Sequence, residues 1–258
     1  MHAHIVLAHP ETRSFNGHLV TVAQSTLQEQ GWTVSISDLY QKNFDPCERS
    51  SHYQTPRDAA RFNVQAEQRH ACEQLTIPID VQEEIKLLDA ADLLILQYPM
   101  WWHMPPAMLK GWFDRVFIYG KVYSSSTRFE HGRFAKKRAM LSVTVGTSRE
   151  TYAYNGRSGD IELLLWPMNF NLAYAGYTVL KPFIAYGVEA GIQYSDQTVI
   201  ESRLQTISEQ YENQINTINK IKTIPFHTME DWNDDGQIGE TAPAYSAFIR
   251  HKKELDLA

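Results

Sequence analysis

The sequence predicts an α/β protein built on a doubly wound, five-stranded parallel sheet with helices on both faces. Five short apolar runs alternate with segments of helical spacing, which is the order that builds a parallel sheet. Most of these runs lack a polar face, as expected of strands buried on both sides. The chain has 258 residues, of which 43% are hydrophobic, so there is enough apolar material for one large core.

The first half of the sheet follows from three runs. They cover residues 5–8, 33–37 and 92–98. Apolar residues recur at helical spacing over 17–29, and Gly31 supplies a stop signal. Pro78 can open a second helix that runs through Leu88. The polar stretch 39–77 before it is expected to be irregular, with room for short helices.

The second half repeats the alternation. The remaining strands are expected over 139–145 and 178–185. The helices are expected over 105–116, 160–172 and 196–222. Pro167 is expected to break or bend the second of these helices. Five strands without a long insertion favour the order 2-1-3-4-5, which is the flavodoxin-like arrangement.

Residues 1–222 therefore form one predicted α/β domain, and residues 223–258 form an extended C-terminal arm. Within the arm, 231–238 matches the start of a calcium-binding EF-hand loop. The oxygen-bearing side chains are Asp231, Asn233 and Asp235. Ala242 stands where the bidentate Glu is needed, so a turn is favoured over a cation site, and no metal site is predicted. An alternative is that Trp232 folds over an active site.

Charge and cysteine content argue against several classes of protein. The net charge of −6 disfavours broad binding to nucleic acid or to anionic membranes. The uncharged stretch 163–177 contains Pro167, Gly176 and two asparagines, so no membrane span is expected. Cys47 and Cys72 lack paired spacing, and no signal peptide is visible, so a cytoplasmic location is expected.

Ligands of such sheets bind outside the carboxyl ends of the strands, which draws attention to the loops there. The first loop, 9–17, has neither GxGxxG nor a P-loop, which disfavours both nucleotide sites. It still leads into a helix whose N–H groups can bind an anion, and His9 and Arg13 add positive charge. Ser14 and Asn16 can contact that anion or simply cap the helix.

The third and fourth loops suggest a flat ligand. Trp101 and Trp102 directly follow a buried strand, where an aromatic ring can lie beside a flat group. Trp112-Phe113, further into the helix, is expected to belong to the core. The loop 145–148 supplies backbone N–H groups and a hydroxyl that can bond to the polar edge of a heterocycle.

Taken together, these residues resemble the NAD(P)H:quinone oxidoreductases of the DT-diaphorase type. The resemblance is carried in order by His9 with Ser14-Phe15-Asn16, Asp38-Leu39-Tyr40 with Asn43-Phe44, Gln97-Tyr98-Pro99, Pro106 to Phe117, and Leu165-Trp166-Pro167. The Lys110-Gly111-Trp112-Phe113 segment is highly specific. The resemblance implies a flavodoxin-like domain over 1–222 that binds FAD. It also implies a homodimer and ping-pong, two-electron reduction of quinones by NADH or NADPH.

The resemblance also implies roles for individual residues. The residues implied to hold the pyrophosphate and ribityl chain are His9, Arg13, Ser14, Phe15 and Asn16. Those implied to line the isoalloxazine are Met100, Trp101, Trp102 and His103. Those implied to meet its polar edge are Thr144, Val145, Gly146, Thr147 and Tyr152. Asn63 is implied to touch the FAD of a second subunit, and Tyr123 to cover it.

Three segments of the chain depart from the family pattern. A Gln-Trp-Phe is replaced by Trp101-Trp102-His103, and a pair of glycines by Gly146-Thr147. The family pairs its active-site tyrosine with a histidine six residues later, whereas here Tyr152 is followed by Ser158. Tyr152 is predicted to donate to the flavin edge, Ser158 at most to pass a proton onward, and His103 to contact substrate. The alternative is that Tyr152 only packs in its loop and that His103 is solvated.

Two other functions are compatible with the same fold. One keeps the flavin and changes the acceptor to azo or nitro compounds. The other is a non-catalytic, regulatory flavoprotein subunit of a potassium-efflux transporter.

Overall fold

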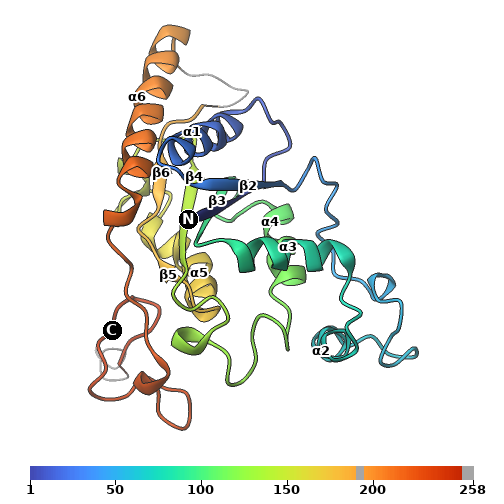
Figure 1. Ribbon diagram of the computed structural model, residues 1–258. Coiled ribbons are helices and arrows are strands. Elements are labelled where there is room, and N and C mark those ends of the chain that lie inside the picture. The colour runs from blue at the N-terminus through green and yellow to red at the C-terminus, as the bar shows by residue number, and fades with distance from the viewer. Residues whose placement is uncertain (190–194, 252–258) are drawn as a thin grey trace.

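The computed structural model describes residues 1–189 and 195–251, and at its centre lies a parallel sheet (Figure 1). The strands are β1 His2–Leu7, β2 Thr33–Asp38, β3 Leu93–Pro99, β4 Arg138–Thr144, β5 Thr178–Val179 and β6 Phe183–Ala185. Their order is β2-β1-β3-β4-β5, with β6 also paired to β4. The predicted flavodoxin-like, doubly wound sheet is confirmed.

Helices cover both faces of the sheet. They are α1 Phe15–Glu29, α2 Val64–Gln74, α3 Ile79–Ala90, α4 Ala107–Val116, α5 Ile161–Tyr174 and α6 Gln197–Asn216. Figure 1 shows α1 and α6 side by side on one face and α3 and α4 on the other. Each face has its own core, represented by Leu19 and Ile207 on the first and by Ile85 and Trp112 on the second. Among the described residues, no helix combines the length and the hydrophobicity needed to span a membrane.

The register of the strands brings three loops to one edge of the sheet. Leu7 at the end of β1 pairs with Gln97 of β3, and Pro99 at the end of β3 pairs with Thr144 of β4. Because the strands are parallel, the loops that follow β1, β3 and β4 leave the sheet on the same side.

The strand predicted over 178–185 is two strands rather than one. β5 and β6 both pair with β4, but the chain between them turns away. Pro182 has no N–H to contribute to a ladder, and the N–H of Lys181 donates instead to the carbonyl of Lys222, at 2.8 Å. The interruption therefore arises from a proline together with a competing partner.

The helix predictions need two corrections. The stretch 39–77, which left room for short helices, contains one regular helix, α2, whose buried face includes the polar residues Glu67 and Gln68. α5 runs unbroken through Pro167, which lies on its exposed side, where water can hydrate the carbonyl that loses its donor. α6 ends at Asn216, and a separate 3₁₀ turn follows, so the helix predicted to reach residue 222 is too long.

The arm folds back onto the domain. Thr223 forms an antiparallel bridge with Leu180, and Phe248 stacks on Trp166 of α5 with ring centroids 4.7 Å apart. Trp232 packs on Phe129, which itself lies against the C-terminal part of α5. Within one chain, Trp232 therefore lies away from the loop that contains Tyr152, because that loop precedes the opposite end of α5. That Trp232 folds over an active site stays a prediction.

The predicted turn at 231–238 is present. The Asn233 Oδ1 atom accepts hydrogen bonds from the N–H groups of Asp235, at 3.1 Å, and Gln237, at 2.9 Å. Asp231 accepts from the backbone N–H and the hydroxyl of Thr228, which caps a short 3₁₀ helix. Asn233 thus closes the turn, and Asp231 serves the cap of the preceding 3₁₀ helix.

Candidate functional site

Three loops converge at the carboxyl edge of the sheet. They cover residues 8–14, 100–106 and 145–160. The Met100 N–H donates to the carbonyl of Thr144 at 2.9 Å, which joins the second loop to the end of β4. The rings of His9 and Trp101 lie 6.2 Å apart, which brings the first loop to the second. The structure thus gathers the segments that the sequence analysis singled out.

A buried amide network fixes the start of α1 on the strand ends. The Asn16 side chain is 3% exposed, and its Nδ2 donates to Thr144 Oγ1 at 3.0 Å. Its Oδ1 accepts from Gln97 Nε2 at 2.9 Å. Asn16 was predicted to contact FAD, but its side chain is occupied here as a clamp between β3 and β4. The sequence analysis used Gln97 only as part of the resemblance and gave it no role, although a lone polar residue inside a buried apolar run was an available signal.

The first loop presents a helix N-terminus with free donors. Ser14 caps α1, and its hydroxyl oxygen accepts from the Gly17 N–H at 3.3 Å. The N–H groups of Phe15 and Asn16 have no acceptor inside the helix, because first-turn donors lack one. A Cβ at position 17 would lie 1.8 Å from the carbonyl oxygen of Thr12, so only glycine permits this close turn. The arrangement suits a phosphate group.

Arg13, which was predicted to add positive charge for a ligand, is paired with a carboxylate of its own loop. Arg13 is 88% exposed, and its Nε and Nη2 atoms each lie 3.1 Å from the Glu11 carboxylate. Arg13 lowers the pKa of Glu11 to about 2, so the carboxylate is charged and neutralises it. His9 Nδ1 accepts the backbone N–H of Glu11 at 3.0 Å, so the neutral ring carries its proton on Nε2 and can donate it to a ligand. His9 is therefore better placed than Arg13 to meet an anion.

The two adjacent tryptophans belong to a tight hairpin. Trp101 N–H donates to the Met104 carbonyl at 2.9 Å, and Met104 N–H returns a bond at 3.0 Å. Trp102 and His103, between them, have φ values of 52° and 61°, as a two-residue hairpin of this type requires. Trp102 is 95% exposed and Trp101 42% exposed. The hairpin holds its aromatic rings uncovered at the site, where a flat ligand can stack against them.

Tyr152 lies in the third loop and faces the ring of His103 on the hairpin. It ends a 3₁₀ turn, Glu150–Tyr152, and its ring centroid is 6.5 Å from that of His103. Burial raises the pKa of Tyr152 above that of a free phenol, and hydrogen bonds with Thr147 and Ser158 offset part of this effect. The phenol is therefore neutral at pH 7 and keeps a proton to donate.

The third loop also offers backbone donors. The Val145 N–H donates to the Ala185 carbonyl at 2.9 Å. By contrast, within residues 1–189 and 195–251, the N–H groups of Gly146 and Thr147 donate to no backbone carbonyl. The nearest atom to a Cβ placed on Gly146 would be 3.9 Å away, so there is room beside this backbone for a ligand. Free donors, uncovered rings and a helix N-terminus together fit a flavin.

Asn63 is not brought to this site within one chain. It caps α2, and its Oδ1 accepts from the Ala66 N–H at 3.1 Å. α2 packs against Tyr119, just beyond the C-terminal end of α4, whereas the hairpin precedes the N-terminal end of that helix. A contact between Asn63 and the flavin therefore requires a second subunit.

Comparison with known proteins agrees with this geometry. A family model for the flavodoxin-like fold matches residues 1–215. The chain is 37% identical over 211 residues to NAD(P)H dehydrogenase (quinone) 1 of Rattus norvegicus, covering 80% of this chain and 77% of that protein. It is 37% identical over 208 residues to ribosyldihydronicotinamide dehydrogenase (quinone) of Homo sapiens, covering 79% and 90% respectively.

A solved structure shares the whole architecture. It is that of a Klebsiella pneumoniae protein provisionally named a quinone reductase, with a TM-score of 0.81 and 30% identity. The match covers 96% of this chain and 97% of that one, so it extends into the C-terminal arm. By fold, sequence and the makeup of its loops, the chain belongs to the flavodoxin-like NAD(P)H:quinone oxidoreductase family.

Proposed function

We propose that the protein binds FAD and reduces quinones by two electrons at a time, with NADH or NADPH as donor, in a ping-pong sequence. The observation that carries the proposal is the convergence of a helix N-terminus, an uncovered tryptophan pair and free N–H groups at one sheet edge. The bound flavin supplies hydride acceptance and release. A cytoplasmic location is part of the proposal, since neither Cys47 nor Cys72 is in a disulfide.

The start of α1 holds the pyrophosphate in this proposal. The N–H groups of Phe15 and Asn16 and the hydroxyl of Ser14 face outward from a helix N-terminus, where negative charge is stabilised. His9 Nε2 adds a further donor. The Asn16 side chain contributes indirectly, by keeping the helix start fixed to Gln97 and Thr144.

The tryptophan hairpin covers the ring system. Trp101 and Trp102 offer apolar faces that exclude water from one side of a flat cofactor, and Met100 continues that wall toward β4. Opposite them, the N–H groups of Gly146 and Thr147 donate to the polar edge, next to Val145. These donors stabilise negative charge that develops there.

Tyr152, Ser158 and His103 handle protons. Tyr152 stays protonated, so its hydroxyl acts as a donor toward the same polar edge. Ser158, whose hydroxyl partly offsets the raised pKa of Tyr152, can accept a proton only while passing one onward. His103 is exposed on the facing hairpin, where an imidazole can exchange a proton with acceptor and solvent.

A homodimer completes the proposal. Tyr119 and Tyr123, whose rings meet edge to face at 5.4 Å, lie half-buried beyond α4. A twofold interface over this surface would bury them and bring Asn63 toward the flavin of the partner.

The experiment separates the two half-reactions. Flavin-loaded protein is mixed without oxygen with NADH or NADPH, and the reduced protein is then mixed with a quinone alone. We expect each donor-driven loss of flavin absorbance to be reversed by the quinone. Protein that holds flavin but is bleached by neither nucleotide contradicts the proposal and favours a regulatory role. If azo or nitro compounds restore the flavin absorbance and quinones do not, the electron acceptor is an azo or nitro compound rather than a quinone.

A further inference from the structure

A second tyrosine lies against Tyr152 at the carboxyl edge of the sheet. Tyr186 directly follows β6, whose last residue, Ala185, pairs with Thr144 at the end of β4. The ring centroids of Tyr152 and Tyr186 are 6.4 Å apart, and the ring planes are inclined by 49°. Both side chains are half-buried and pack against the core on the α3 and α4 face of the sheet. Tyr186 therefore reaches the candidate site from a segment outside its three loops.

The backbone around Tyr186 is tied to the loop that carries the free donors. The Gly187 N–H donates to the Thr147 carbonyl at 2.8 Å, and the Val188 N–H donates to the Val145 carbonyl at 2.9 Å. These bonds continue the pairing of β6 with β4 beyond the ends of both strands. They fix the position of Tyr186 relative to the backbone that offers its N–H groups to a ligand.

Tyr152 is held less firmly by its own loop. Residues 146–150, which lead into the turn that Tyr152 ends, are all exposed. The ring of His103, 6.5 Å away, is exposed on the hairpin. Of these two ring neighbours of Tyr152, Tyr186 is the one that is half-buried and tied to the sheet, so Tyr186 limits how far the Tyr152 ring can turn.

Tyr186 acts through its ring rather than through charge. Burial raises the pKa of its phenol, and Arg149 offsets part of this effect, so the hydroxyl stays protonated at pH 7. A neutral phenol neither attracts nor accepts the proton of Tyr152. What Tyr186 offers is an aromatic face, and tilted ring pairs at this spacing are favourable beyond the area that they bury.

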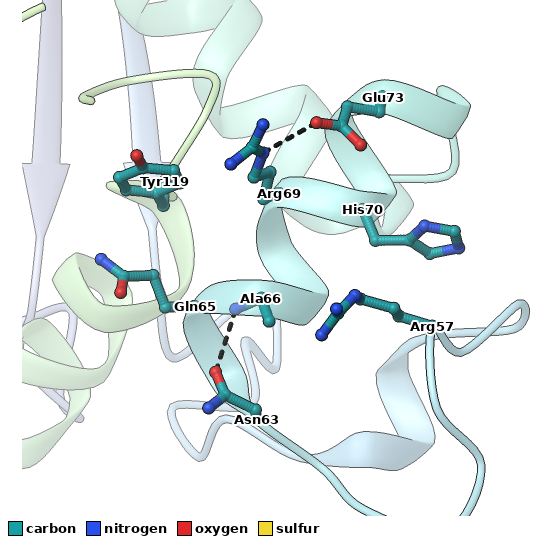
Figure 2. A pocket seen from close by; sticks show the side chains of 8 residues that line it. All are labelled: Arg57, Asn63, Gln65, Ala66, Arg69, His70, Glu73 and Tyr119. Atoms are coloured by element: carbon teal, nitrogen blue, oxygen red, sulfur yellow. Dashed lines mark hydrogen bonds and ion pairs between the residues drawn. The ribbon is translucent and has the colours of Figure 1, made fainter. Parts of the chain in front are cut away.

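We propose, on the basis of the proposed function, that Tyr186 is a positioning residue that holds the Tyr152 phenol toward the polar edge of the bound flavin. Both tyrosines lie at the carboxyl edge of the sheet within one chain. The α2 surface drawn in Figure 2, with Asn63, Arg69 and Tyr119, lies instead beyond the C-terminal end of α4. A dimer that covers α2 therefore leaves the tyrosine pair in place.

The first test compares Tyr186→Ala with Tyr186→Phe in flavin-loaded protein, by stopped-flow reduction with NADH or NADPH. Tyr186→Ala removes the ring and lets Tyr152 turn away, so reduction should slow about two- to tenfold. Tyr186→Phe keeps the ring and should react at the wild-type rate. The matched control is Tyr154→Ala, which truncates a neighbouring tyrosine that is 84% exposed and should also react at the wild-type rate. Added to Tyr152→Phe, Tyr186→Ala should slow reduction no further, because the hydroxyl that it positions is already gone.

The absorbance spectrum of the oxidised, bound flavin gives a second readout that needs no turnover. The visible bands of a flavin respond to hydrogen bonds at its polar edge, so Tyr152→Phe should shift them. Tyr186→Ala should shift the bands in the same direction by a smaller amount, and Tyr186→Phe should leave them unchanged. Tyr186→Leu, which keeps apolar bulk at this half-buried position, replaces the alanine variant if that variant does not hold flavin.

The positioning role is overturned if Tyr186→Ala reacts and absorbs as the wild type does, or if Tyr186→Phe loses as much as Tyr186→Ala. It is also overturned if Tyr152→Phe changes neither the rate nor the spectrum, or if Tyr186→Ala slows Tyr152→Phe by the factor by which it slows the wild type. A flavin-loaded wild type that neither nucleotide reduces contradicts the proposed function instead, and the flavin spectra then decide the role of Tyr186.

Discussion

Replacing Tyr152 by phenylalanine removes a single hydroxyl group from the site and is expected to slow flavin reduction. Because burial keeps the phenol protonated, the group lost is a neutral donor to developing negative charge. A hydrogen bond to a charged group contributes about 1.5–3 kcal/mol, which corresponds to a rate loss of roughly ten- to a hundredfold. Ser158→Ala removes only a bond between neutral hydroxyls, worth about 0.5–1.5 kcal/mol, so its effect should stay below about tenfold.

Stopped-flow reduction by NADPH, from about pH 5.5 to 9, measures both effects. Tyr154→Phe is the control, because Tyr154 is a neighbouring tyrosine that is 84% exposed. We expect the control to react at the wild-type rate. If Tyr152→Phe also does so, Tyr152 only packs in its loop. If Ser158→Ala slows flavin reduction as much as Tyr152→Phe does, the serine belongs to the proton path. Our account of Ser158, which stands where the family has a histidine, is then wrong.

Three further predictions concern the clamp, acid stability and assembly. Asn16→Ala leaves the buried amide of Gln97 without its partner, so the free energy of unfolding in urea should fall by about 2–4 kcal/mol. An unchanged midpoint of the urea transition would show that this amide network does not stabilise the fold. Burial lowers the pKa of His4 to about 4, below the unfolded value near 6.5, so its stabilising contribution is present above pH 6.5 and is lost as the pH falls toward 4. In His4→Asn, the free energy of unfolding should therefore fall by about 2–3 kcal/mol less than in the wild type as the pH is lowered from 6.5 to 4. If the urea midpoints of the two proteins change with pH in the same way, this prediction is wrong. Sedimentation at micromolar concentration should give about twice 29.7 kDa, and a stable, active monomer would rule out shared sites.

The strand order was predictable because the central strands are unambiguous in sequence. β3 is buried along its entire length and is accordingly almost wholly apolar. α2 was not predictable, because its buried face carries Glu67 and Gln68, whose partners are backbone groups of Arg57 and Tyr119. A polar residue that is buried against a distant backbone group looks like a surface residue in sequence.

The site was predictable at the level of loops but not of individual side chains. Motif spacing brought His9, Trp101 and Tyr152 to one sheet edge, as the structure shows. It could not show that Trp102 adopts a left-handed backbone, because that conformation is imposed by the hairpin bonds rather than by residue preference. It also could not show that the side chain of Asn16 bonds to two strand ends, which leaves only its backbone N–H for a ligand.

The cofactor content of the purified protein tests the central claim most directly. The absorbance spectrum shows whether a flavin is bound, and mass spectrometry identifies what acid releases. Our account predicts a yellow protein that releases FAD. Release of FMN alone would contradict the assignment of FAD. A colourless protein that takes up neither FAD nor FMN would contradict the flavin site itself.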